Sequence, residues 1–203
     1  MEYSVYKYKD HNEYVKNQIE KWKANINGKW VGDNDIKYLY DSFLSKHFNK
    51  INFGICHGAK TGYENQLFSK YTGANFIGTD LSLSNYSENV IKWDFHEVKD
   101  EWINNVDVIY TNALDHTYKP VECLSAWIKC LTDDGVIIIE WSKYHGTDYE
   151  ASWSDPLSAN KDGYWKFIED AGGVKIEELS CVTSNAFRKD ILKYFLIFGK
   201  RKT

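Results

Sequence analysis

Two glycines and an aspartate follow successive apolar runs within residues 51–82, in an order that could bind a nucleoside-bearing cofactor. Gly58 and Gly62 permit a tight turn in which the backbone approaches a ligand closely. Asp80 stands 18 positions after Gly62, at the end of the second apolar run. A carboxylate at this place can accept hydrogen bonds from both hydroxyl groups of a ribose. Its alternative role is to cap the following turn together with Ser82.

A second group of reactive side chains follows the apolar run 106–110. Asn112, Asp115 and His116 are candidates for contact with a transferred group. His116 is suited to take a proton from a hydroxyl near neutral pH, although a structural hydrogen bond or a cofactor contact is the alternative. Asp115 could orient the imidazole or anchor a substrate. Neighbours on an extended segment point opposite ways, so both would face one site only if the chain turns there.

The stretch 141–156 is long, aromatic and polar, and long segments without regular structure are often functional. His145, Tyr149 and Trp153 could line an acceptor pocket, with His145 as the alternative base. The aromatic side chains could instead cover the layer beneath them.

The elements that must position these residues alternate between short β-rich runs and helical patterns, which predicts βαβ units and a parallel sheet. Strands are expected near 51–56, 75–79, 90–93, 106–110 and 136–140. Helices are expected after the glycine turn and at 120–131 and 164–171. The runs VKIEELSCV and LKYFLIFGKR predict an antiparallel hairpin. The resulting fold is α/β and Rossmann-like, with a seven-stranded, mostly parallel sheet and helices on both faces.

The first fifty residues predict two further helices. Asp10 or Asn12 is expected to cap the first, and Asp33 or Asn34 the second.

Residues 51–200 resemble the class I S-adenosylmethionine-dependent methyltransferases. The heptapeptide GAKTGYE at 58–64 is similar to a G-A-[KR]-x-G-x-E variant of the family's first motif, which surrounds the methionine part of the cofactor. The resemblance implies that a set of residues in this turn binds S-adenosyl-L-methionine: Gly58, Ala59, Lys60, Gly62 and Glu64. Glu64 would receive the ammonium group of the cofactor directly or through water. As an acid at a helix N-terminus, it is equally explained by the helix dipole.

The resemblance assigns the rest of the cofactor site to the following strands. Asp80 would bind the ribose, and Leu81 would pack beside the adenosine. In VIKWDF, Asp94 would accept from the exocyclic amine of adenine, and Phe95 would supply a backbone donor. A surface turn is the alternative for that segment. Asn112 completes the set.

The resemblance implies methyl transfer to an acceptor molecule. The sequence lacks a [DN]-P-P-[YFW] segment and a Pro-Cys pair, so an oxygen or an unconjugated amine is the default acceptor. We expect O-methylation of a small molecule or sugar, with His116, Asp115 and His145 as catalytic candidates. No metal is expected, although Asp115 and Asn112 could ligate a divalent cation.

The resemblance also predicts how the chain is organised into a cofactor-binding domain and a lid. Residues 51–203 would form the cofactor-binding domain, and residues 1–50 a helical lid that closes over it with the stretch 141–156, all within one compact domain.

Two other classes of function stay open. An NAD(P)-dependent oxidoreductase would share the fold and Asp80, but the glycine turn lacks GxGxxG. A protein that binds a nucleoside cofactor without catalysis would share every binding residue.

Composition narrows the partners. The net charge is −4 and no long basic run occurs, which disfavours nucleic acid. The polar N-terminus and the lack of an apolar run of ~18 residues disfavour a signal peptide and a membrane span, so a cytoplasmic protein is expected. The four cysteines lie far apart and are expected to be buried free thiols. The sequence does not indicate the oligomeric state.

Overall fold

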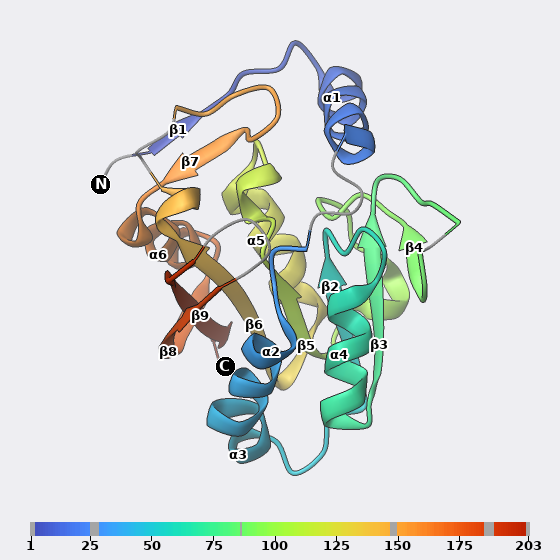
Figure 1. The fold of residues 1–203 in the computed structure, drawn as a ribbon, viewed down its shortest axis with the longest axis vertical. Coiled ribbons are helices and arrows are strands. Elements are labelled where there is room, and N and C mark those ends of the chain that lie inside the picture. Colours follow the sequence, from blue (N-terminus) through green and yellow to red (C-terminus); the bar gives the residue numbers. More distant parts are fainter. Residues whose placement is uncertain (1–2, 25–28, 86, 147–149, 185–188, 202–203) are drawn as a thin grey trace.

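The computed structural model describes residues 3–24, 29–85, 87–146, 150–184 and 189–201. Its centre is a seven-stranded sheet with the strand order β4-β3-β2-β5-β6-β9-β8 (Figure 1). The strands are β2 (Phe53–His57), β3 (Asn75–Asp80), β4 (Val90–Lys92), β5 (Val106–Thr111), β6 (Leu131–Ser142), β8 (Gly173–Thr183) and β9 (Ile191–Lys200). The strands from β4 to β6 pair in parallel, and β9 is antiparallel to both β6 and β8. The predicted sheet with its antiparallel hairpin is confirmed.

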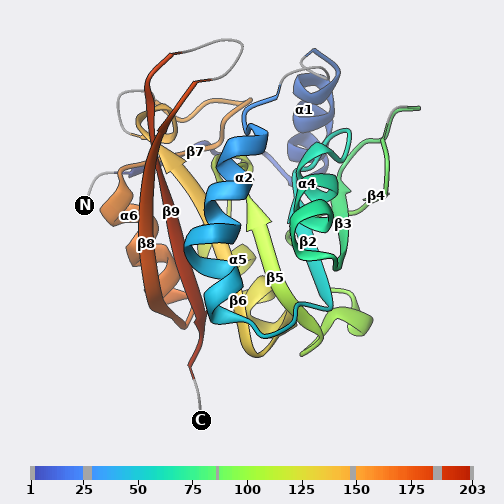
Figure 2. The same cartoon turned by 60° about the horizontal axis from the view of Figure 1, so that its bottom comes forward.

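Helices cover both faces of this sheet, as predicted (Figure 2). One face carries α2 (Asp33–Leu39), the π-helical turn η1 (Tyr40–Leu44), α3 (Ser45–His47) and α4 (Tyr63–Thr72); the other carries α5 (Pro120–Cys130) and α6 (Lys161–Asp170). Strand β6 shows the reason. Its Ile138 packs into the apolar layer of α2 and α4, whereas its neighbour Ile139 packs into that of α5 and α6. A strand buried on both faces is a continuous apolar run.

The first helix, α1 (His11–Ala24), is capped by Asp10, whose Oδ1 accepts from the Glu13 backbone N–H at 2.9 Å. The expected cap of α2 is wrong. Gly32 is the N-cap residue, and its backbone N–H donates to Asp35 at 3.0 Å. Asp33 lies inside the first turn and pairs with Lys70 at 2.9 Å.

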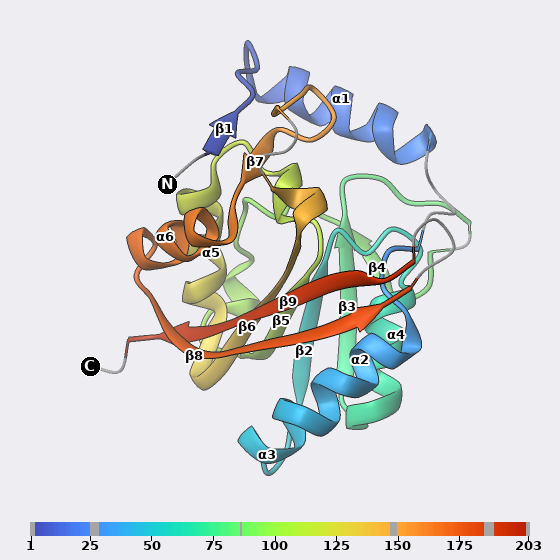
Figure 3. The ribbon, with the colours of Figure 1, turned by 60° about the vertical axis from the view of Figure 1, so that its left-hand side comes forward.

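A second, two-stranded sheet was not predicted. Strand β1 (Tyr3–Val5) pairs antiparallel with β7 (Leu157–Ala159), and α1 lies beside this pair at one end of the molecule (Figure 3). Strands of three residues are too short to show an alternating pattern.

The two helical parts of the predicted lid segment, residues 1–50, lie in different places in the structure. Helix α1 borders the pocket described below, whereas α2 packs its Ile36 and Leu39 into the apolar core of one sheet face. The four cysteines are free thiols, and Cys181 is the one that is not fully buried. Within the described ranges, no helix is long and apolar enough to cross a membrane.

Candidate cofactor and acceptor site

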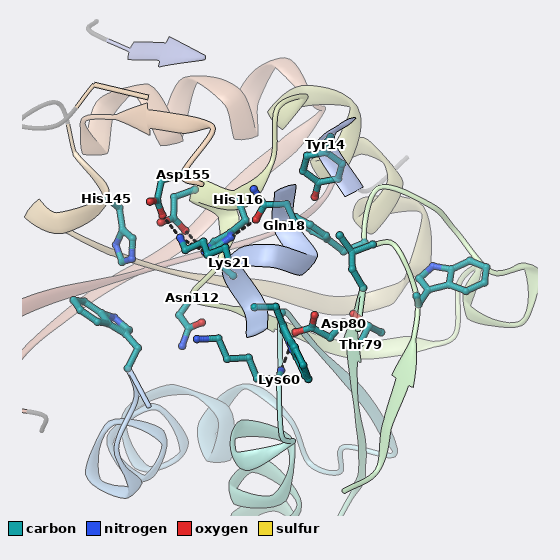
Figure 4. A pocket seen from close by; sticks show the side chains of 18 of the residues that line it. Tyr14, Gln18, Lys21, Lys60, Thr79, Asp80, Asn112, His116, His145 and Asp155 are labelled. Carbon is teal, nitrogen blue, oxygen red and sulfur yellow. Dashed lines mark hydrogen bonds and ion pairs between the residues drawn. The ribbon is translucent and has the colours of Figure 1, made fainter. Parts of the chain in front are cut away.

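A cavity of about 380 Å³ lies at the carboxyl ends of the parallel strands (Figure 4). This size suits a small-molecule site, and its position is the usual one for ligands of open α/β sheets. Its walls come from α1 and from segments that follow successive strands: Tyr14, Gln18, Lys21, Trp22, Trp30, Gly58, Lys60, Thr79, Asp80, Leu81, Trp93, Phe95, Asn112, Ala113, Asp115, His116, Tyr144, His145 and Asp155.

The glycine turn joins β2 to α4. The Gly58 and Ala59 backbone N–H groups donate to the Thr79 carbonyl at 2.9 and 3.1 Å, which ties the turn to β3. Gly62 has φ +86°, and a Cβ there would lie 2.1 Å from the Glu88 carbonyl oxygen. Only glycine fits this close approach. Ala59 and Gly62 therefore shape the turn and lie off the cavity wall.

Asp80 ends β3 and lines the cavity. Its Oδ2 accepts from the Lys60 backbone N–H at 2.9 Å, and its Oδ1 accepts from the Ser82 N–H at 3.4 Å. Burial raises the pKa of Asp80 to about 6, although these hydrogen bonds oppose the rise. The carboxylate thus organises both neighbouring turns and faces the cavity, so the capping role and a ligand-binding role are compatible.

Glu64 and Asn112 meet below the cavity floor. The Asn112 amide donates to Glu64 Oε1 at 3.5 Å, and Asn112 itself lines the wall. Burial raises the pKa of Glu64, and hydrogen bonds together with nearby Lys60 oppose this rise. Burial lowers the pKa of Lys60, which also lines the wall. This end of the cavity therefore offers an amide, an ammonium and, beneath them, a partly buried carboxyl group.

Asp94 does not reach the wall, in contrast to the apolar side chains of Leu81, Trp93 and Phe95. Its Oδ1 accepts from His96 Nδ1 at 2.8 Å and from the His96 backbone N–H at 2.9 Å, whereas its Oδ2 lies 3.2 Å from His11 Nε2 and has no hydrogen-bond partner among the described residues. Burial acts to raise the pKa of Asp94, but the two histidines outweigh it and the pKa is lowered. The side chain expected to face adenine therefore bonds His96 through one oxygen and does not line the cavity.

Asp115 and His116 do share one wall, because the chain turns between them. The 3-10 turn η3 (Leu114–His116) replaces the extended segment that would have separated them. Asp115 Oδ1 lies 4.0 Å from His116 Nε2, is buried and has no hydrogen-bond partner among the described residues. Burial raises the pKa of Asp115.

Gln18 of α1 sets the tautomer of His116. The Gln18 amide nitrogen donates to the Tyr8 hydroxyl and the Ser154 carbonyl, both at 3.3 Å, so its Oε1 faces His116 Nδ1 at 2.7 Å. His116 Nδ1 therefore carries the proton, and Nε2 presents a lone pair to the cavity.

The ammonium group of Lys21, on α1, lies within hydrogen-bond distance of that lone pair. Its Nζ lies 3.2 Å from His116 Nε2 and forms an ion pair with Asp155. Burial and the Lys21 charge lower the pKa of His116 to about 4. Burial acts to raise the pKa of Asp155, but Lys21 and His116 outweigh it. Asp115, His116 and Asp155 place ligand atoms within 4.8 Å of one another, a spacing open to a cation, and Lys21 supplies one.

Sequence reasoning did not identify Gln18, Lys21 or Asp155. A signal existed for the first two, because Tyr14, Gln18, Lys21 and Trp22 recur at the spacing of one helix face. The sequence did not show whether Gln18 and Lys21 face solvent or a cavity, since polar residues on a helix usually face solvent.

His145 is a weaker candidate for a base than His116. Its Nδ1 accepts from the Ser142 backbone N–H at 3.0 Å, which leaves the proton on Nε2. Burial lowers its pKa to about 4. The Trp30 ring lies 5.4 Å from the imidazole and forms an aromatic wall with Tyr144. Trp153 is exposed and lies off the wall, and Tyr149 lies outside the described residues.

An ionic network lies behind Trp30. Lys193, fully buried, pairs with Asp35 at 2.9 Å and with Glu140 at 3.0 Å. Its Nζ also donates to the Trp30 carbonyl at 3.1 Å, and the Trp30 indole N–H donates to Glu140. Tyr110 donates a further hydrogen bond to Glu140 at 3.0 Å. The network connects the middle of the sheet to this wall of the cavity.

Neither a protein-family model nor a curated protein sequence matches the chain. Solved structures are similar in fold. The 1,6-didemethyltoxoflavin-N1-methyltransferase of Burkholderia thailandensis, with bound 1,6-didemethyltoxoflavin and S-adenosylhomocysteine, has a TM-score of 0.73 at 13% identity, covering 97% of this chain and 93% of that chain. The geranyl diphosphate C-methyltransferase of Streptomyces coelicolor A3(2) has a TM-score of 0.62 at 9% identity, covering 93% and 98%.

The [4+2]-cyclase SpnF is also similar, with a TM-score of 0.66 at 9% identity, covering 93% of each chain. One fold therefore accompanies more than one reaction among these structures. The function must be argued from the residues of the site.

Proposed function

Since the chain has the fold of the class I S-adenosylmethionine-dependent methyltransferases, we propose that it transfers a methyl group from S-adenosyl-L-methionine to an oxygen of a small molecule or sugar. One observation carries this proposal: a single cavity holds the glycine turn, Asp80 and Asn112 at one end and the lone pair of His116 at the other. Two of the similar structures are methyltransferases named for small-molecule substrates, which supports the same class of acceptor.

The residues at the cofactor end fit the chemical groups of S-adenosyl-L-methionine. Asp80 is a partly buried acceptor for the two ribose hydroxyls, and Leu81, Trp93 and Phe95 supply apolar walls for the adenine. Lys60 offers a positive charge to the methionine carboxylate. When bound, the cofactor would supply a methyl group already activated by its sulfonium.

The ammonium group of the methionine part needs acceptors. Glu64 with Asn112 offers a carboxylate and an amide oxygen at the floor. Ala59 and Gly62 contribute through the shape of the turn, and we do not assign Asp94 to adenine because its side chain does not line the cavity.

His116 would remove the proton from the acceptor hydroxyl. Its Nε2 lone pair faces the cavity, and Gln18 holds the ring through Nδ1. The buried Asp115 carboxylate, 4.0 Å from Nε2, would stabilise the imidazolium that forms. A pKa of about 4 makes this imidazole a weak base, so we expect positioning of the acceptor to contribute to the rate together with proton removal.

Helix α1 and the segment after β6 would close the acceptor end. Gln18 bonds the Ser154 carbonyl, and Lys21 pairs with Asp155, so these contacts join the two segments across the cavity. A lid of this kind excludes water and completes the site. Trp30 and Tyr144 would pack against a ring of the acceptor. A cytoplasmic location stays a prediction.

Turnover is tested by incubating the protein with S-adenosyl-L-methionine that carries an isotopically labelled methyl group and with a metabolite extract. We expect the label in a small molecule, together with formation of S-adenosylhomocysteine. Binding of S-adenosylhomocysteine without any labelled product would favour a protein that binds the cofactor without catalysis. Binding of NAD instead would favour an oxidoreductase.

The affinity for S-adenosylhomocysteine is expected to fall about tenfold between about pH 7.5 and about pH 5, because the ribose hydroxyls donate to the ionised form of Asp80 and its pKa is about 6. Above that pKa the carboxylate is available, and below it the protonated group loses acceptor capacity. Calorimetry across this range measures the profile. Asp80→Asn should bind S-adenosylhomocysteine weakly at every pH, and its affinity should not change with pH. If the affinity of this variant fell with pH as that of the wild type does, a group other than Asp80 would be responsible for the pH dependence.

A further inference from the structure

Lys21 places a nucleophilic atom inside the proposed active site. Its side chain reaches from α1 into the cavity, and its Nζ lies 3.2 Å from His116 Nε2 (Figure 4). Asp155 pairs with the same Nζ from the opposite segment. About three quarters of the Lys21 side chain is buried, since its exposed fraction is 24%.

The proposed function gives this position to the acceptor. A base must lie within hydrogen-bond reach of the proton that it removes, roughly 2.6–3.2 Å between heavy atoms. Lys21 Nζ meets this requirement at His116 Nε2 in the present structure. The tautomer set by Gln18 leaves the required lone pair on Nε2. In the absence of an external acceptor, the atom in its place is therefore the amine of Lys21.

We propose that Lys21 is a methyl acceptor within its own chain, an inference that rests on the proposed function. One proton leaves Lys21 Nζ to His116 Nε2 and passes to solvent. The Nζ lone pair then forms a bond to the methyl carbon while the carbon–sulfur bond breaks, and its electrons stay on sulfur. S-adenosyl-L-methionine loses its sulfonium charge and becomes S-adenosylhomocysteine, and Lys21 becomes N-methyl-lysine, whose ammonium carries the positive charge that left the sulfur.

The contacts of Nζ predict where the reaction stops. A lysine ammonium has three N–H donors, and the contacts with His116 and Asp155 use two. One position remains for a methyl group, and the methylated ammonium keeps both contacts and its charge. We therefore expect monomethyl-lysine.

Mass spectrometry of the full chain tests this. The protein is incubated with S-adenosyl-L-methionine carrying a deuterated methyl group and no other acceptor, and fragmentation of the α1 peptide locates the label. We expect one methyl group on Lys21, either present on purification or added during incubation, at a rate per chain that does not change on dilution. Lys21→Arg should carry none. Lys23→Arg, a change at an exposed position on the same helix, should be labelled like the wild type.

His116→Ala should slow labelling of Lys21 at least about tenfold, because the proton acceptor is lost. The control is calorimetry with S-adenosylhomocysteine on the same preparation. Binding of S-adenosylhomocysteine with an unmodified Lys21 would overturn this inference and leave the proposed function standing. Absence of binding would overturn both, and labelling of Lys23 or a rate that rises with protein concentration would contradict transfer within the chain.

Discussion

Lys193→Met is expected to lower the free energy of unfolding by about 3–5 kcal/mol, because it leaves two carboxylates buried without their cation. Asp35 and Glu140 are 2% and 1% exposed, and both pair with Lys193. Burial already raises the pKa of Glu140, which the Lys193 charge opposes. Methionine keeps the length of the side chain, so the charge is the main change. Urea unfolding measured at neutral pH gives the difference.

Lys37→Met is the matched control. Lys37 pairs with Asp41 four residues along the chain, and both side chains are 53% exposed. Exposed pairs of this kind contribute little to stability, because solvent screens the two charges. Equal losses of stability for the two variants would mean that the buried network does not hold this part of the sheet. Since Lys193 and Glu140 also bond Trp30, the Lys193 variant should loosen the aromatic wall of the cavity as well.

His116→Ala is expected to lower turnover of the external acceptor by about 10² to 10⁴ while the affinity for S-adenosylhomocysteine stays near that of the wild type. The imidazole lone pair faces the cavity, and the substitution removes both this base and its contact with Gln18. Single-turnover kinetics with the acceptor recovered from the extract would separate the chemical step from binding.

His47→Ala provides the comparison, because His47 is exposed and lies on α3, outside the cavity wall. It should keep full turnover. A parallel loss of S-adenosylhomocysteine affinity in His116→Ala would make His116 a binding residue. Unchanged turnover would mean that another group or the solvent takes the proton of the acceptor.

The sheet and the cofactor end were predictable because their signals are local. Each parallel strand is a short apolar run that ends at a glycine or polar residue, and the carboxyl ends of neighbouring strands meet at one edge. Asp80 and Asn112 therefore reached the cavity as expected. Asp94 did not: its Oδ1 is bonded to His96, two residues along the chain, and its Oδ2 lies beside His11, the first residue of a distant helix that the local pattern does not reveal.

The acceptor end depends on contacts between distant segments. Lys21 and Asp155 are far apart in the sequence, and neither belongs to a motif. The turn at Leu114–His116 begins shortly after strand β5 ends at Thr111. Only the geometry of this turn brings Asp115 and His116 to the same wall. Long-range pairing of this kind has no signature in composition or periodicity.

The most direct test of the account is calorimetry with S-adenosylhomocysteine on the wild type, Asp80→Ala and Asp41→Ala. We expect the wild type and Asp41→Ala, a change at an exposed position, to bind alike. Asp80→Ala should bind about 5- to 150-fold more weakly, because the ribose hydroxyls lose a partly buried acceptor. No binding to the wild type, or equal affinity in all three proteins, would contradict the assignment of this cavity to S-adenosyl-L-methionine.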